Sequence, residues 1–325
     1  MRLARAGPGN GYRPLIWSRA REPAILKQPS PPEMPMIRRR YLQLDVFAAR
    51  PGAGNPLGVV VDAEGLDGAA MQAIATWTNL SETIFLLPPG TGADYRVRIF
   101  TPGRELPFAG HPSVGAAWAA LDQGLARGAG GRLVQQCGAG LLPVRIDAAH
   151  GRVLPSVRAP RARVLAAPQD GADHLAAVLR ALGNADAPHA LLDNGPLWWC
   201  VDLGEAAAVR DLAPPLADIA AICVATGAVG LAVFGRAHDA DHALAVRAFC
   251  PADGIPEDPV TGSANAAIAA WLHAGDRLGG IGTSYVASQG RELGRDGRVR
   301  VEIDADGEVW IGGAVQAVVR GTFDW

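Results

Sequence analysis

Two titratable side chains, His111 and Asp258, each stand directly before a proline at the expected start of an apolar helix. An imidazole and a carboxyl group can both exchange protons near neutral pH when their surroundings shift their pKa values. Proline is favoured at the first helical position, and a helix start carries free N–H groups and about half a positive charge. Two such helix starts facing one cleft would bind a carboxylate or a phosphate and could move protons on it.

The two helix starts belong to a repeated pattern. Arg98-Ile99-Phe100 matches Arg247-Ala248-Phe249 at an offset of 149 residues, and His111-Pro112 matches Asp258-Pro259 at an offset of 147. This alignment predicts a two-residue deletion in the connecting loop of the second copy and makes His111 and Asp258 counterparts. A repeat of this length indicates two related lobes, each with a strand, a loop and the start of a helix.

Further groups near the helix starts could bind a ligand. The predicted donors are the backbone amides of the first helical turns, and the small residues there allow close approach to the backbone. These donors are Ser113, Val114 and Gly115 in the first copy and Thr261, Gly262 and Ser263 in the second. A third acid, Glu82, stands at the junction of a predicted helix and an apolar strand. Taken alone, Glu82 fits a solvated loop acid, and Asp258 fits an ordinary helix N-cap.

Hydrophobic periodicity predicts the elements that must position these groups. The predicted helices are 66–78, 112–123, 172–182 and 259–273, and the predicted strands are 41–47, 57–61, 83–87, 95–100, 142–146, 153–157, 198–203, 229–234, 243–249, 298–303, 309–312 and 315–319. The helices after His111 and Asp258 are apolar or tiny nearly all the way round, so they must be enclosed. We therefore predict an α+β fold of two pseudo-symmetric lobes, each a curved, mainly antiparallel, barrel-like sheet around a central helix.

The boundaries of the lobes follow from composition. Residues 1–37 are rich in arginine and proline and show no period that would bury a face, so we predict a disordered extension there. The N-terminal lobe is predicted over 38–160, with the last strand, 313–325, as a candidate part of it. The C-terminal lobe is predicted over 161–312, after a segment rich in alanine, proline and arginine.

Composition favours a protein that acts on a small molecule. Of the 325 residues, 49% are hydrophobic, which is enough apolar mass for two domains. The formal net charge of −2 gives no reason to expect nucleic acid as a partner. No apolar run approaches the roughly 20 residues that span a bilayer, so no membrane partner is expected. The four cysteines include no C-x-x-C pair and are predicted to be free thiols in the reducing cytoplasm.

Five motifs, in order, resemble those of the phenazine-biosynthesis PhzF-like isomerases, which share the diaminopimelate-epimerase fold of two similar lobes. The resemblance covers the chain from about residue 40 to its end. The motifs are Asn55-Pro56, Asn79-Leu80-Ser81-Glu82-Thr83, Arg98-Ile99-Phe100-Thr101-Pro102, Glu105-Leu106-Pro107-Phe108-Ala109-Gly110-His111-Pro112 and Glu257-Asp258-Pro259-Val260-Thr261-Gly262-Ser263-Ala264.

This resemblance implies roles for individual residues. It makes Glu82 the acid/base that moves a proton between carbons, with His111, Asp258 and Ser263 holding the substrate and relaying protons. The predicted substrate contacts are Ser81, Gly110, Ser113, Thr261, Gly262 and Ser263. It further implies a small carboxylate substrate, no metal, no organic cofactor and a homodimer. Racemases of this fold use a pair of cysteines, and no cysteine stands at position 111 or 258.

Three other functions fit the same residues. The chain could be an epimerase or dehydratase of an amino-acid-like substrate that uses Glu82 with a different partner. It could also be a catalytically silent carboxylate-binding protein, since the motifs that bind an acid and those that transform it overlap. A third alternative treats Glu82, His111 and Asp258 as metal ligands.

Overall fold

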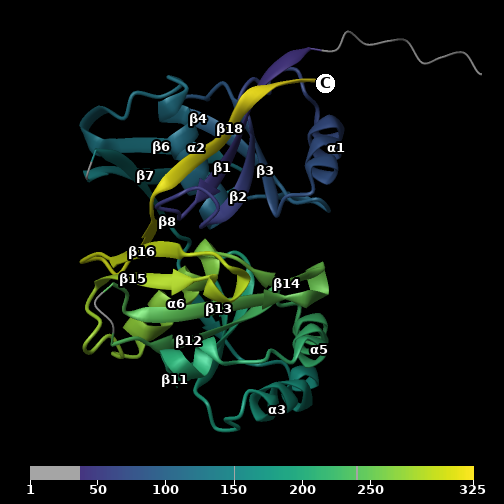
Figure 1. The fold of residues 1–325 in the computed structure, drawn as a ribbon, viewed down its shortest axis with the longest axis vertical. Coiled ribbons are helices and arrows are strands. Elements are labelled where there is room, and N and C mark those ends of the chain that lie inside the picture. Colours follow the sequence, from purple (N-terminus) through teal and green to yellow (C-terminus); the bar gives the residue numbers. More distant parts are fainter. Residues whose placement is uncertain (1–36, 150, 239–240) are drawn as a thin grey trace, which may run out of the picture. The chain divides into compact units, whose positions relative to one another are not determined.

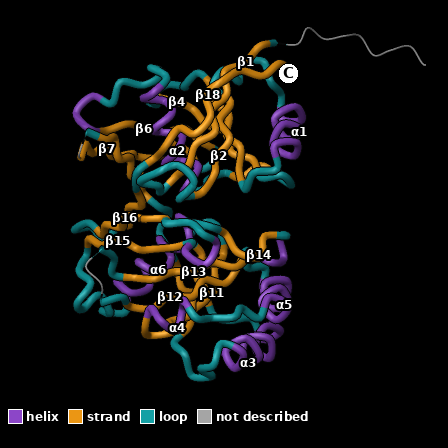
Figure 2. The backbone as a smooth tube through the Cα atoms, viewed as in Figure 1, coloured by secondary structure: helices purple, strands orange, loops and turns teal. Residues whose placement is uncertain are grey.

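Two central helices organise the chain, as the computed structural model shows (Figure 1). Helix α2 (Gly110–Asp122) and helix α6 (Gly262–Ala274) are each wrapped by a curved, mainly antiparallel sheet, visible as orange strands around purple helices in Figure 2. Ala116, Ala117 and Ala267 are fully buried, so the small side chains let strands pack against the helices on several sides. The predicted α+β fold of two lobes is confirmed.

The structure describes residues 37–149, 151–238 and 241–325. Residues 37–325 form one compact unit, and the extension predicted over 1–37 lies outside the described residues apart from Ile37. The other helices are α1 (Gly68–Thr78), α3 (Ala172–Ala181), α4 (Ala206–Arg210) and α5 (Leu216–Thr226). The strands are β1 (Arg38–Val46), β2 (Asn55–Val60), β3 (Glu82–Leu87), β4 (Tyr95–Phe100), β5 (Glu105–Leu106), β6 (Arg132–Cys137), β7 (Gly140–Ala149), β8 (Arg152–Arg158), β9 (Arg163–Leu165), β10 (His189–Asp193), β11 (Leu197–Glu205), β12 (Gly230–Arg236), β13 (Leu244–Cys250), β14 (Ile255–Asp258), β15 (Ser284–Gln289), β16 (Gly297–Ile303), β17 (Val309–Gly312) and β18 (Val315–Asp324).

Strand pairing repeats from one lobe to the other. The neighbours β1-β2-β3-β4-β6-β7-β8 correspond in order and direction to β10-β11-β12-β13-β15-β16-β17, with the short strands β5 and β14 attached to β4 and β13. The last strand, β18, pairs antiparallel with β1, and β9 pairs in the same way with β10. Strand β8 also pairs with β17, so one continuous sheet joins the lobes.

The loop between strand and helix differs from the sequence prediction. Arg98 corresponds to Arg247, but helix α2 begins at Gly110 and helix α6 only at Gly262, three residues beyond the predicted Pro259. The second copy therefore carries a three-residue insertion, where a two-residue deletion was predicted. The error arose because both helix starts were assigned to an X-Pro step, whereas only Pro112 lies inside its helix.

The corrected register changes which residues are counterparts. Counted from the helix starts, His111 corresponds to Ser263 and not to Asp258. In the sheets, Thr83 pairs with Phe100 and Leu231 pairs with Phe249, so Glu82 corresponds to Gly230. The two lobes thus share a backbone plan but place different chemical groups on it.

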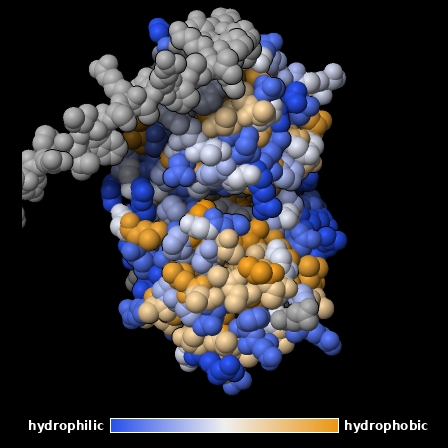
Figure 3. Space-filling view, turned by 90° about the vertical axis from the view of Figure 1, so that its right-hand side faces the viewer, coloured by the Kyte–Doolittle hydropathy of each residue, from blue (hydrophilic) through white to orange (hydrophobic). Residues whose placement is uncertain are grey.

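Apolar side chains form three cores. The largest runs through both lobes and packs around α2 and α6, while smaller ones lie under α1 and under α3 and α5. On the side where α1, α3 and α5 lie, apolar residues gather over the C-terminal lobe (Figure 3). None of the described helices is long and apolar enough to cross a membrane.

Gly230 has no room for a side chain, which gives a test of the second lobe's packing. A Cβ atom there would lie 2.5 Å from the Phe249 carbonyl oxygen and 2.6 Å from the Trp198 ring. We expect Gly230→Ala to lower the free energy of unfolding by about 1–3 kcal/mol in urea denaturation. Gly279→Ala, where a Cβ meets nothing within 4 Å, should change it by less than about 0.5 kcal/mol; equal values for the two variants would contradict this packing.

Candidate active site

Glu82 and His111 face each other where the lobes meet. Glu82 begins β3, and His111 is the second residue of α2. The His111 Nδ1 and Glu82 Oε2 atoms are 3.5 Å apart, beyond a good hydrogen bond. The two side chains are only 5% and 16% exposed. Among the described residues, Glu82 Oε2 and His111 Nε2 are buried without a hydrogen-bond partner, so each could meet a ligand.

Asp258 is held by hydrogen bonds on both of its carboxylate oxygens. Asn55 Nδ2 donates to Oδ1 at 3.0 Å, and Thr261 Oγ1 donates to Oδ2 at 2.5 Å. Asn55 also accepts a hydrogen bond from the Ser81 hydroxyl at 3.1 Å. Because Asn55 belongs to the N-terminal lobe and Asp258 to the C-terminal lobe, this chain of hydrogen bonds ties the lobes together beside Glu82.

Gln289, at the end of β15, fixes the turn between Asp258 and helix α6. Its Nε2 donates to Thr261 Oγ1 at 2.9 Å and to the Asp258 carbonyl at 3.1 Å. Its Oε1 accepts from the Thr261 amide and from Asn265 Nδ2, both at 3.0 Å. Since the Thr261 hydroxyl accepts from Gln289, its own proton is directed to Asp258.

Burial shifts the pKa values of all three titratable groups. Desolvation raises the pKa of Glu82 to about 7, against a smaller opposing effect of Ser81. Desolvation also lowers the pKa of His111 to about 4, against the attraction of Asp258. The pKa of Asp258 rises to about 6 because of burial and of the negative charge of Glu82. The site therefore holds a neutral imidazole next to a carboxyl group that titrates near neutral pH.

The two helix starts are in contact. A Cβ atom on Gly110 would lie 3.3 Å from the backbone of Gly262, and one on Gly262 would lie 3.2 Å from the His111 nitrogen. A cavity of about 10 Å³ beside them is lined by Ser263 and Asn194 among others, which is room for about one water molecule.

The predicted amide donors need one correction. The Ser113 amide donates to the Ala109 carbonyl at 3.1 Å, and its hydroxyl accepts from Gln135 at 2.9 Å. The Thr261 amide is likewise engaged by Gln289. Because each helix begins elsewhere than predicted, the amides without an intrahelical acceptor are those of Gly110 and His111 in α2 and of Gly262, Ser263 and Ala264 in α6.

Several polar residues of the site were not predicted. Trp198 donates its indole N–H to Ser263 Oγ at 3.1 Å, and Asn194 Nδ2 donates to the Ser263 carbonyl at 2.8 Å. Asn55 was noted only as part of a motif, and Gln289 carried no signal in the sequence. These residues join the site through strand pairing over long sequence separations, which a local pattern does not reveal.

The alternative of a metal site finds no geometric support. Within residues 37–149, 151–238 and 241–325, no group of three or more His, Cys, Asp or Glu side chains could hold a metal ion.

Fold and site together define an enzyme of the two-lobed, epimerase-like class with buried acid/base groups. Residues 44–321 match the family model of phenazine biosynthesis-like proteins (PhzC-PhzF). The trans-2,3-dihydro-3-hydroxyanthranilate isomerase of Pseudomonas aeruginosa is 36% identical over 277 residues, covering 83% of this chain and 92% of the relative. The chain belongs to the phenazine biosynthesis-like (PhzC-PhzF) family, and it is an isomerase of the PhzF type.

Solved structures agree with this assignment. The PhzF-family phenazine biosynthesis protein of Bacillus anthracis superposes with a TM-score of 0.74 at 25% identity, covering 89% of this chain and 99% of that one. A hydroxyproline epimerase from Agrobacterium vitis shares the fold at a TM-score of 0.61 and 14% identity, covering 88% and 92% of the two chains. The predicted resemblance to PhzF-like proteins and to the epimerase fold is confirmed.

The raised pKa of Glu82 predicts a pH-dependent stability. Its value moves from 4.5 to about 7 on folding, so between these pH values the folded state binds more protons than the unfolded chain. The free energy of unfolding therefore falls as pH rises through this window. Glu82→Gln removes this pH dependence. Between pH 5 and pH 8, the free energy of unfolding of the variant should therefore rise by about 1–3 kcal/mol relative to that of the original protein.

Urea denaturation at several pH values measures this difference. His111 has the opposite effect between about pH 4 and 6.5, since its pKa is lowered on folding, but it is present in both proteins. The charge of Glu82 also contributes to the raised pKa of Asp258, so its removal acts in the same direction as the loss of Glu82 itself. Glu105→Gln is the control: the pKa of this largely exposed acid lies below its ordinary value, so the variant should follow the original protein above pH 5. Parallel curves for Glu82→Gln and the original protein would show that Glu82 is not perturbed.

Proposed function

We propose that the chain moves a proton between two carbons of a small cyclic or conjugated carboxylic acid, with Glu82 as the general acid/base and His111 and Asp258 as its catalytic partners. The observation that carries this proposal is the pair of buried, unpartnered atoms, Glu82 Oε2 and His111 Nε2, at the junction of the lobes. Leaving such atoms without hydrogen bonds costs stability. A substrate that supplies the missing partners explains why they are kept.

The chemistry needs one group that both takes and returns a proton. The Glu82 carboxylate would accept a proton from one substrate carbon, the bonding electrons would shift along the conjugated system, and the resulting carboxylic acid would return the proton to another carbon. A pKa of about 7 makes both forms accessible near neutral pH, which is the best range for a general acid/base. No atoms or electrons are gained or lost, so the step needs no oxidant or reductant, and we propose that it proceeds without a metal or an organic cofactor.

The helix starts would bind the substrate's acid group. The amides of Gly110 and His111 and those of Gly262 and Ser263 lie where helices α2 and α6 meet, and Ser81 lies next to Glu82 on the same side of the network. Preorganised N–H groups of this kind stabilise negative charge that develops when a carbon is deprotonated. The Glu82 and His111 side chains are only 16% and 5% exposed, so we propose that the lobes separate to admit the substrate and then close against water.

The wider assignment rests on the family. We propose trans-2,3-dihydro-3-hydroxyanthranilate as the first substrate to test, because the name of a relative with 36% identity gives it as that relative's substrate. We further propose that the protein is cytoplasmic and acts as a homodimer, which its mass in solution by light scattering would test.

Replacing Glu82 tests the proposed reaction. With trans-2,3-dihydro-3-hydroxyanthranilate in metal-free D₂O buffer, the original protein should turn the substrate over and incorporate solvent deuterium at carbon. Glu82→Gln keeps the size of the side chain but cannot cycle a proton, so kcat should fall by about 10²- to 10⁴-fold.

Three outcomes would contradict the proposal. Undiminished turnover by Glu82→Gln would remove this residue from the chemistry. Deuterium incorporated with inversion at a single carbon, without movement of a double bond, would indicate an epimerase. Binding of the substrate without any exchange would indicate a silent carboxylate-binding protein.

Variants of Trp198 and Trp199 test whether the hydrogen bond to Ser263 serves the reaction, with Trp199 as the control. Both are buried neighbours on β11, and each donates its indole N–H to a hydroxyl at 3.1 Å: Trp198 to Ser263 in the site, Trp199 to Thr226 outside it. Phenylalanine removes either hydrogen bond. We expect Trp198→Phe to lower kcat/KM about tenfold and Trp199→Phe to change it by less than about twofold. Equal effects would mean that the hydrogen bond to Ser263 does not serve the reaction.

A further inference from the structure

The strand that carries Asp258 is weakly held by its backbone. Strand β14 is short and pairs with β13 at only two positions, Ala248 with Asp258 and Cys250 with Ile255, with an irregularity between them. A β-ladder fixes a strand through successive hydrogen bonds, and an interrupted ladder leaves it able to shift. The position of Asp258 therefore depends on contacts made by side chains.

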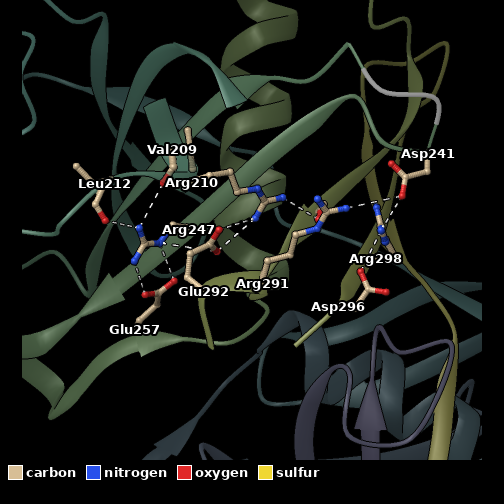
Figure 4. A network of polar contacts seen from close by, with 11 residues as sticks. Val209, Arg210, Leu212, Asp241, Arg247, Glu257, Arg291, Glu292, Asp296 and Arg298 are labelled. Carbon is tan, nitrogen blue, oxygen red and sulfur yellow. Dashed lines mark hydrogen bonds and ion pairs between the residues drawn. The ribbon is translucent and has the colours of Figure 1, made fainter. Parts of the chain in front are cut away.

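Glu257, the residue before Asp258, forms an ion pair with the buried Arg247 (Figure 4). Arg247 Nε and Nη2 donate to the two carboxylate oxygens of Glu257 at 2.9 and 2.8 Å. The two side chains are only 6% and 8% exposed. Arg247 Nη1 also donates to the Leu212 carbonyl at 2.7 Å and the Val209 carbonyl at 3.3 Å. The guanidinium is thus fixed on both sides, and its planar fork fixes Glu257 in turn.

A second ion pair supports the first. Glu292 Oε2 lies 4.0 Å from Arg247 Nε, and Arg210 Nη1 donates to Glu292 Oε1 at 3.1 Å. Arg210 Nη2 also donates to Ser288 Oγ at 2.9 Å, next to Gln289 on β15. Positive and negative groups alternate along this row, so each buried charge has an opposite neighbour. The network reaches the site at two points, Glu257 beside Asp258 and Ser288 beside Gln289.

The N-terminal lobe contains an equivalent arginine–glutamate pair, but no residue that corresponds to Asp258 in charge. Arg98 Nε and Nη2 donate to the Glu105 carboxylate, both at 2.6 Å, and Glu105 stands in β5 as Glu257 stands in β14. This pair is much more exposed, at 26% and 43%, and is followed by Leu106 where the second copy has Asp258. An exposed ion pair is therefore sufficient to form the connection between these two strands. Burying a pair costs desolvation, and in this protein the buried pair adjoins a titratable group of the site.

We propose that Arg247 and Glu257 are positioning residues that hold Asp258 in line with Asn55, Thr261 and Glu82 for the proton transfer. The expected effect on kcat rests on the proposed function, whereas the expected change in the contacts of Asp258 does not. Neither residue touches the reacting atoms. Their effect passes through the backbone of β14, and a displacement near 1 Å at the site is enough to cost about 100-fold in rate.

Two variants with identical chemistry test this. Glu257→Gln and Glu105→Gln each neutralise one acid of a bidentate pair. In crystal structures, Glu257→Gln should lose at least one of the bonds from Asn55 and Thr261 to Asp258, now 3.0 and 2.5 Å, and Glu105→Gln should keep both. With trans-2,3-dihydro-3-hydroxyanthranilate, kcat of Glu257→Gln should fall about 100-fold with KM within about threefold, and Glu105→Gln should stay within about twofold for both.

The outcomes separate this proposal from the proposed function. Intact Asp258 contacts in Glu257→Gln, or kinetics equal to those of Glu105→Gln, would overturn it. If the original protein does not convert the probe, the isomerase assignment is in doubt for that substrate, while the two crystal structures still decide on positioning. Arg247→Lys keeps the charge but lacks the fork; it replaces Glu257→Gln should that variant fail to fold, with the same expected results and the same criteria.

Discussion

The desolvation of Glu82, His111 and Asp258 at the junction of the two lobes is the constraint on which the site depends. Each group comes from a different element, and burial shifts each pKa toward the neutral form. One lobe alone would leave its groups facing water, where a carboxyl group is ionised at neutral pH. These pKa shifts therefore require both lobes, and the partly buried hydrogen bond from Asn55 to Asp258 joins one lobe to the other.

The pseudo-symmetric fold carries an asymmetric site. At the position that corresponds to Glu82 the second lobe has Gly230, whose missing side chain is replaced by the ring of Trp198. At the position of His111 it has Ser263, which accepts the Trp198 indole N–H. The second lobe thus contributes hydrogen-bond donors and Asp258 but no base opposite Glu82.

Local sequence patterns predicted the features of this protein that depend on residues close together in the sequence. The enclosed helices, most strands and the candidate residues Glu82, His111 and Asp258 followed from apolar periodicity, repeated residues and motif resemblance. Helices α4 and α5 and strands β5, β6, β9, β10, β14 and β15 were missed. The register of the repeat was wrong because an X-Pro step was taken for both helix starts, whereas Thr261 is the N-cap of α6. Asn55, Trp198 and Gln289 could not be assigned roles, since long-range strand pairing brings them together.

The three titratable groups differ in how far they are already satisfied. Asp258 accepts hydrogen bonds on both oxygens from Asn55 and Thr261, and the threonine is itself fixed by Gln289. Glu82 and His111 each keep one buried polar atom without a partner. A fully bonded carboxylate is rigid and directs an electrostatic field, whereas an unpartnered one can bind and exchange a proton. This distribution of hydrogen bonds supports the proposed roles, in which Asp258 is an orienting group, Glu82 exchanges the proton and His111 Nε2 meets the ligand.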